Sequence, residues 1–216
     1  MLKAILSVVP VEKTQAVWQA AKDAGSPGGT IIPGKGSASN NVLSILGFGD
    51  TPKDIILTVV PESIEQAVRN AIQEECLNKT VHRGAMFSLD VPCFIKSGSK
   101  SNSYMEENSM SNDSFQMIVT IVNKGFAEDA MAAARKAGAS GGTILNGRGT
   151  AKEGDEKFFG VEIVPEKEML IILADSKKAR DIIASIKEID SFSKDGSGII
   201  FTASANDFLL LGKSKQ

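Results

Sequence analysis

The chain has 216 residues, of which 42% are hydrophobic and 23% are charged, and its formal net charge is −2. This balance is ordinary for a globular protein and gives no electrostatic reason to expect nucleic acid, which selects a basic surface. No apolar stretch approaches the ~20 residues that cross a bilayer, and the first residues lack the pattern of a secretory signal. With only two cysteines, Cys76 and Cys93, and no metal-binding spacing, we expect a cytoplasmic protein with reduced thiols and no transmembrane segment.

The first part of the chain predicts six elements in the order β-α-β-β-α-β. Runs of β-branched and apolar residues predict the strands, and apolar residues at helical spacing predict the helices. Gly25 stands where a helix C-cap glycine belongs, and Gly34-Lys35-Gly36 reads as a turn after the second strand. The predicted strands cover residues 2–9, 29–33, 54–60 and 85–91, and the predicted helices cover residues 12–24 and 62–75.

The second part predicts the same order after an interruption. Residues 95–114 are rich in serine and asparagine and predict a flexible linker. Asp175 is the expected N-cap of the last helix, and residues 208–211 could add a short fifth strand. The predicted strands cover residues 115–122, 142–145, 168–174 and 199–203, and the predicted helices cover residues 126–137 and 176–188.

Matching residues recur at a constant spacing, which indicates an internal duplication. Gly28-Gly29-Thr30 recurs as Gly141-Gly142-Thr143, and Gly34-Lys35-Gly36 recurs as Gly147-Arg148-Gly149. The order β-α-β-β-α-β is the split βαβ arrangement. We therefore predict an α+β protein of two tandem ferredoxin-like domains, residues 1–94 and 115–212, each an antiparallel sheet with its helices on one face. The opposite sheet face then needs cover from an oligomer or from the other repeat.

The two Gly-basic-Gly segments are candidate anion sites. Glycines let a backbone approach a phosphate closely, successive N–H groups can form an anion-binding nest, and Arg148 or Lys35 adds a full charge. Spacing alone favours the alternative of a tight turn with a solvated basic residue, because one Gly-x-Gly is a weak signal.

Other residues give no catalytic or metal site. His82 is the only histidine, so neither a Ser-His-Asp arrangement spanning both copies nor a histidine-based metal cluster is expected. Trp18 is expected to pack in the core. Phe158 and Phe159 either pack into the core below the loop or contact a partner. The acidic residues Glu153, Asp155 and Glu156 form either a solvated loop face or a docking element.

The stretch from Ala137 to Thr150, with Phe158 to Ile163 and Pro165 to Glu168, resembles the PII nitrogen-regulatory signalling family, closest to its shorter-loop members. The resemblance covers both repeats and is stronger in the second. It implies a ferredoxin-like fold, assembly into a trimer-like ring and adenine nucleotides between subunits. It also implies a loop between the second and third strands that contacts a protein partner, such as a membrane transporter or a metabolic enzyme.

By this resemblance, candidate ligand residues can be placed in the sequence. Thr143 would lie near the adenine and Gly147, Arg148 and Gly149 near the phosphates, while Gly196 and Gly198 match a glycine-rich turn that wraps phosphates from a second side. Ile199 and Ala85 stand where the family has a phosphate-binding lysine. The counterparts in the first repeat are Thr30, Gly34, Lys35 and Gly36.

The sequence thus favours a PII-like regulator, with no enzymatic activity, that senses ATP, ADP, AMP or another anion and controls a partner through the loop after the second strand. The second repeat is the better candidate for a retained site, since its loop is charged and the loop of the first repeat is nearly neutral. The alternative is a structural or scaffolding module with a degenerate ligand site, which the missing lysine favours.

Overall fold

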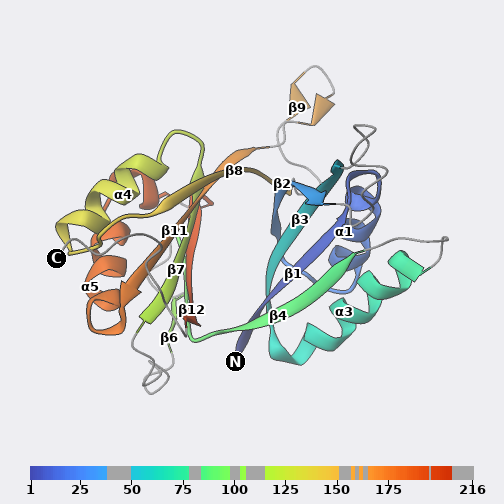
Figure 1. Cartoon of the computed structure of the whole chain (residues 1–216), viewed down its shortest axis with the longest axis horizontal. Coiled ribbons are helices and arrows are strands. Elements are labelled where there is room, and N and C mark those ends of the chain that lie inside the picture. The colour runs from blue at the N-terminus through green and yellow to red at the C-terminus, as the bar shows by residue number, and fades with distance from the viewer. Residues whose placement is uncertain are drawn as a thin grey trace. The chain divides into compact units, whose positions relative to one another are not determined.

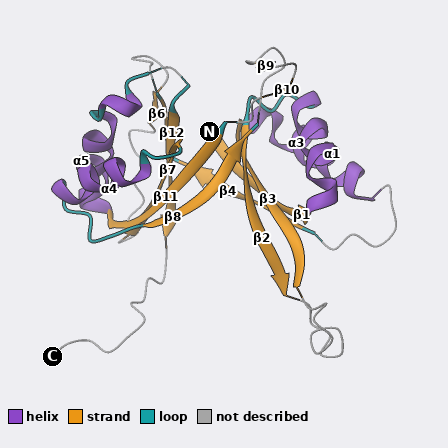
Figure 2. Ribbon diagram, turned by 90° about the horizontal axis from the view of Figure 1, so that it is seen from above, coloured by secondary structure: helices purple, strands orange, loops and turns teal. Residues whose placement is uncertain are grey.

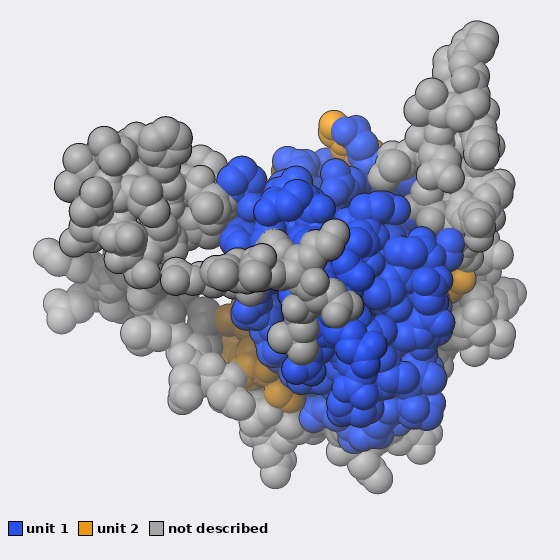
Figure 3. Space-filling view, turned by 90° about the vertical axis from the view of Figure 1, so that its right-hand side faces the viewer, with its two compact units in different colours: residues 1–91, 145–169 blue, residues 92–144, 170–216 orange. Residues whose placement is uncertain are grey.

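A computed structural model describes residues 1–37, 50–77, 84–97, 103–105, 115–150, 157–158, 161–162, 165–194 and 196–205. These residues pack as two compact units (Figure 3). Unit 1 consists of Met1–Val91 with Leu145–Met169, and unit 2 consists of Pro92–Ile144 with Leu170–Gln216. The segment Leu145–Met169 therefore packs with the first part of the chain. The domain boundaries that the sequence indicates, at residues 94 and 115, stay a prediction.

Unit 1 has an antiparallel sheet in the order β4-β1-β3-β2, with its two long helices on one face (Figures 1 and 2). Buried side chains of β1, α1, β3 and α3, Trp18 among them, form its core, so Trp18 packs as predicted. The elements are β1 (Leu2–Pro10), the short 3₁₀ turn η1 (Val11–Lys13), α1 (Thr14–Asp23), β2 (Gly29–Ser37), β3 (Asp50–Pro61), α3 (Glu62–Leu77) and β4 (Ala85–Val91).

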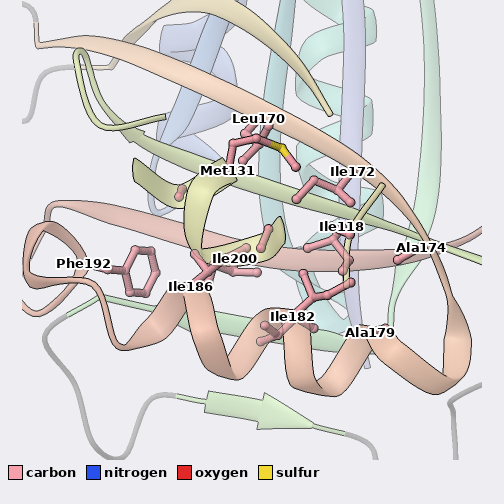
Figure 4. Close-up of a cluster of buried hydrophobic side chains, with 14 of the residues drawn as sticks. Ile118, Met131, Leu170, Ile172, Ala174, Ala179, Ile182, Ile186, Phe192 and Ile200 are labelled. Carbon is pink, nitrogen blue, oxygen red and sulfur yellow. The ribbon is translucent and has the colours of Figure 1, made fainter. Parts of the chain in front are cut away.

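Unit 2 has strands in the order β11-β7-β12-β5-β6, again with its helices on one face (Figure 2). Its core packs α4 and α5 against β7, β11 and β12, and Figure 4 shows Met131, Leu170 and Ile182 within it. The elements are β5 (Cys93–Lys96), β6 (Ser103–Met105), β7 (Phe115–Asn123), α4 (Ala127–Lys136), β11 (Glu166–Asp175), α5 (Ser176–Lys187), the 3₁₀ turn η2 (Asp190–Phe192) and β12 (Gly198–Ala205).

Strand β8 (Thr143–Gly149) begins in unit 2 and ends in unit 1. A short hairpin of β9 (Lys157–Phe158) and β10 (Val161–Glu162) follows it in the chain. The order β-α-β-β-α-β therefore occurs twice, as β1-α1-β2-β3-α3-β4 and as β7-α4-β8-β11-α5-β12, the latter with the hairpin inserted. The mixed α+β class with antiparallel pairing is confirmed, and descent of both halves from one duplicated unit stays a prediction.

Local signals account for several element ends. After α1, Gly25 has a φ of 101°, and the amides of Gly25 and Ser26 bond to the carbonyls of Lys22 and Ala21, which is the Schellman arrangement. At the start of α5 the Asp175 carboxylate accepts a hydrogen bond from the Lys177 amide at 2.9 Å. Both the predicted C-cap glycine and the predicted N-cap are confirmed.

Three local predictions differ from the structure or lie outside it. Gly34-Lys35-Gly36 is no turn, because β2 continues through it opposite Lys53, Pro52 and Thr51 of β3. Residues 95 and 96 of the predicted linker belong to β5, where Ile95 is 2% exposed and lies in the core of unit 2. The predicted fifth strand at 208–211 falls outside the described residues.

Candidate functional site

The segment Gly147-Arg148-Gly149 lies at the end of β8, which pairs there with the beginning of β2. In unit 1, Gly149 of β8 lies opposite Thr30 of β2, and Arg148 lies opposite Ile31. A Cβ at Gly147 would lie 3.1 Å from the Ile31 carbonyl oxygen and 3.2 Å from Thr30 Cγ2. The structure therefore brings the predicted site residues Thr30, Gly147, Arg148 and Gly149 together, and the glycine allows the close approach of β8 to β2.

The backbone amides near this junction are already bonded. The Gly149 amide donates to the Pro165 carbonyl at 2.8 Å, and the Thr150 amide donates to the Gly29 carbonyl at 3.1 Å. Among the described glycines a positive φ occurs at Gly25, Gly125, Gly138 and Gly196, and of these only Gly196 belongs to the predicted site. The glycine motif is thus extended here and forms no nest of free N–H groups, so side chains must supply most of any anion contact.

The most distinctive side-chain arrangement joins Arg148 to a buried carboxylate. Arg148 Nη2 lies 3.2 Å from Asp54 Oδ2, and the same oxygen accepts a hydrogen bond from Thr14 Oγ1 at 2.8 Å. The Asp54 side chain is 5% exposed, whereas the Arg148 side chain is 51% exposed. A buried carboxylate requires such partners, and Arg148 supplies the charge while keeping half of its surface toward solvent.

Lys167 lies close to the same strand on the other side. Its Cε would be 3.5 Å from a Cβ placed on Gly149. Successive residues of a strand project to opposite faces, so Lys167 approaches the face opposite to the one from which Arg148 projects. Burial lowers the pKa of the Lys167 ammonium. The two cations therefore do not form one joint cradle.

Thr150 forms hydrogen bonds that join the end of the second glycine motif to the first. The Gly29 amide donates to Thr150 Oγ1 at 3.0 Å, and the Thr150 hydroxyl lies 3.2 Å from the Gly29 carbonyl. Sequence reasoning missed Asp54, Thr14 and Thr150 as parts of this site. A local signal existed for Asp54, a charged residue directly before the apolar run that predicted the strand; nothing local marked the other two.

The repeated Gly-Gly pair has a packing explanation in both units. A Cβ at Gly29 would lie 2.9 Å from the Leu57 carbonyl oxygen and 2.9 Å from Trp18 Cζ3. A Cβ at Gly142 would lie within 3.0 Å of Leu170, Met131 and Ile171. Gly28 and Gly141, the first member of each pair, would meet nothing within 4 Å. The second glycine is therefore required for packing, whatever the motif binds.

The remaining predicted site residues do not join this junction. Gly34, Lys35 and Gly36 extend β2 along β3. Thr143, Gly196 and Gly198 belong to unit 2, where the Gly198 amide donates to Ser97 Oγ at 2.9 Å and a Cβ would lie 2.4 Å from the Ile121 carbonyl oxygen. Of the predicted partner loop, Phe158 lies in β9, and Glu153, Asp155, Glu156 and Phe159 fall outside the described residues.

Two further observations on the described part of the chain concern metal binding and membranes. It holds no group of three or more histidine, cysteine, aspartate or glutamate side chains that could bind a metal ion. None of its helices is long and apolar enough to span a membrane. Cys76 and Cys93 are free thiols, and burial raises the pKa of both.

Comparison with known proteins gives a family match for the second half of the chain. Residues 115–212 match the family described as "Nitrogen regulatory protein P-II". No curated protein matches the sequence. Two solved structures align over most of the chain at 10% identity. One is described as an unknown protein from Galdieria sulphuraria (95% of this chain, 99% of that chain, TM-score 0.29), and the other is an anthrone oxidase-like protein (98% of this chain, 97% of that chain, TM-score 0.22). At these TM-scores neither likeness supports a conclusion about fold or activity.

Proposed function

We propose that this protein, a PII-like member of the nitrogen regulatory P-II family through its residues 115–212, is a cytoplasmic signal-transduction regulator and not an enzyme. It senses an adenine nucleotide (ATP, ADP or AMP) or another phosphate-bearing anion. It controls a protein partner, a membrane transporter or a metabolic enzyme of nitrogen metabolism, through the predicted partner loop after β8. It works as a homo-oligomer with a trimer-like ring.

The single observation that carries the ligand assignment is the placement of Arg148. It lies in the family-matched segment, two residues before the partner loop, and half of its side chain is exposed. Only its Nη2 contacts Asp54 among the described residues. A guanidinium carries five N–H donors in a rigid fork that suits phosphate, so Arg148 retains donors for an anion.

The proposed mechanism is a shift in population. An anion at Arg148 favours those conformations of the adjoining loop in which the loop and the ligand interact, and partner affinity changes with the population of these conformations. Since a ligand shifts an equilibrium only by its differential affinity for the two states, the loop must contact the ligand or the ligand-bound Arg148.

Calorimetry tests the ligand assignment. The wild type is titrated with ATP, ADP, AMP and cyclic dinucleotides, and the Arg148→Gln variant with whichever of these gives heat. We expect Arg148→Gln to weaken binding at least tenfold, since a charge-assisted bidentate contact contributes about 1.5–3 kcal/mol. Arg135→Gln, at an exposed arginine of α4 in the same family-matched segment, is the control and is expected to bind as the wild type does. Absence of heat with every ligand contradicts the proposal.

A second function is favoured by a different observation. The amides of Gly149, Thr150 and Gly198 are bonded within the protein, which suits a structural or scaffolding module with a degenerate ligand site. Such a module has no ligand-dependent stability. A thermal-shift screen against the same nucleotides separates the two functions, because a ligand that binds the native state alone raises the midpoint of unfolding.

A further inference from the structure

The arginine assigned to the ligand is already engaged by a carboxylate of unit 1. We propose, on the basis of the proposed function, that the Asp54 carboxylate competes with the ligand for Arg148. An anion that binds Arg148 exchanges with this carboxylate. The exchange sets the affinity for the ligand and favours highly charged phosphates. Asp54 and Arg148 are 94 positions apart in the sequence and meet only in the folded unit.

The geometry of the guanidinium makes the two acceptors compete. An arginine binds an anion with two hydrogen bonds through either its Nη1–Nη2 edge or its Nε–Nη2 edge. The Nη2 nitrogen that contacts Asp54 Oδ2 belongs to both edges. A phosphate on either edge therefore comes next to the Asp54 carboxylate. Two negative charges at that range repel each other strongly in a partly dehydrated setting. Arg148 therefore does not hold the phosphate and the Asp54 carboxylate equally well at the same time.

Burial determines how strongly Asp54 competes. With 5% of its side chain exposed, Asp54 cannot exchange Arg148 for bulk water. Within the described part of the chain, the Thr14 hydroxyl at the start of α1 still donates to Asp54 when Arg148 moves away. Removing one member of a buried pair leaves an incompletely compensated charge. Ligand binding must overcome this penalty, and an anion with several charges, such as a di- or triphosphate, does so more readily than a singly charged one.

The exchange also sets the ligand concentration range in which the site responds. While Asp54 holds Arg148, the root of the partner loop is fixed to β3 and to the first residue of α1. A ligand that takes over Arg148 breaks this ion pair, while the hydrogen bonds between Thr150 and Gly29 remain. The competing carboxylate thus couples ligand occupancy to one of the contacts that connect the root of the loop to unit 1.

The decisive experiment compares ATP and pyrophosphate binding by calorimetry in the full chain, in the wild type and in Asp54→Asn. Asparagine keeps the shape of the side chain and an oxygen for Thr14 but removes the charge. We expect Asp54→Asn to bind both probes about three- to tenfold more tightly. Asp54→Ser is the second variant if Asp54→Asn does not fold. Asp90→Asn removes the same charge from β4, where Asp90 pairs with Lys3, and is expected to bind as the wild type does.

A double-mutant cycle separates exchange from a general effect of charge. If Asp54→Asn strengthens binding as much in an Arg148→Gln background, the carboxylate acts through its field and exchange is contradicted. Unchanged or weaker binding by Asp54→Asn, when the wild type binds, overturns the competitor role and leaves the proposed function intact. If neither protein binds ATP or pyrophosphate, both the competitor role and the proposed function fail. Binding by Asp54→Asn alone supports the competitor role, and the Arg148→Gln background then separates exchange from a field effect.

Discussion

Gly29 and Thr150 are joined by three hydrogen bonds although they are 121 positions apart in the sequence. The Gly29 amide donates to Thr150 Oγ1 at 3.0 Å, the Thr150 amide donates to the Gly29 carbonyl at 3.1 Å, and the Thr150 hydroxyl donates to the same carbonyl at 3.2 Å. Thr150, the first residue of the predicted partner loop, is therefore attached to the first glycine motif. Its side chain contributes two of the three contacts.

Removing the Thr150 hydroxyl should weaken this attachment. Thr150→Val keeps the shape of the side chain and removes both side-chain hydrogen bonds. We expect the free energy of unfolding to fall by about 1–2 kcal/mol, since each such bond contributes roughly 1 kcal/mol. Urea denaturation measures the change. Thr150→Ser retains the hydroxyl and should lie close to the wild type. A loss of stability in Thr150→Ser without a loss in Thr150→Val would show that the methyl group, and not the hydroxyl, stabilises the junction.

The Gly-Gly pair gives a matched test of packing. A Cβ at Gly29 would lie 2.9 Å from both the Leu57 carbonyl oxygen and Trp18 Cζ3, whereas a Cβ at Gly28 would meet nothing within 4 Å. Gly29→Ala is expected to destabilise the protein by about 1–3 kcal/mol through overpacking, and Gly28→Ala is expected to be neutral or slightly stabilising. Thermal and urea unfolding measure both. A tolerated Gly29→Ala would contradict the packing explanation of the motif.

Lys167 should influence the pH dependence of stability. Burial lowers the pKa of its ammonium below the ordinary value of 10.5. At pH values between the folded and the unfolded pKa of Lys167, the unfolded state binds more protons, so the free energy of unfolding rises with pH. At lower pH the ammonium is charged in both states, and its burial opposes folding. Lys167→Met is therefore expected to show a smaller rise, or a steeper fall, of unfolding free energy from about pH 7 to pH 10 than the wild type.

Urea titrations at several pH values check this expectation. The exposed Lys136 of α4 provides the control, because Lys136→Met removes the same charge without removing a buried group. The difference in unfolding free energy between Lys167→Met and the wild type should shrink as the pH approaches 10.5. A difference that is constant with pH would mean that packing at Lys167, and not its charge, determines the effect.

The element order could be predicted from the sequence because its signals are local. Apolar periodicity, Gly25 after α1 and Asp175 before α5 each act within a few residues, and the structure confirms them. The extension of β2 through Gly34 to Gly36 could not be predicted, since glycine disfavours strands and the pairing with β3 overrides that preference.

The chemistry of the site was less predictable because its contacts are distant in sequence. Arg148 was a candidate from its motif, but the carboxylate that holds it, Asp54, is identified only when β8 pairs with β2, the neighbour of β3. Glycines at 147 and 149 suggested a phosphate nest, whereas in the structure they serve the close approach of Ile31 and Pro165. A glycine motif alone does not distinguish these two uses.

Hydrogen–deuterium exchange of the predicted partner loop tests the central claim most directly. Peptides covering residues 151–162 are followed in the wild type and in Arg148→Gln, with and without saturating ATP. We expect ATP to change the exchange of these peptides in the wild type and to leave it unchanged in Arg148→Gln. The claim is contradicted if wild-type protein that binds ATP by calorimetry shows the same exchange in this loop with and without the nucleotide.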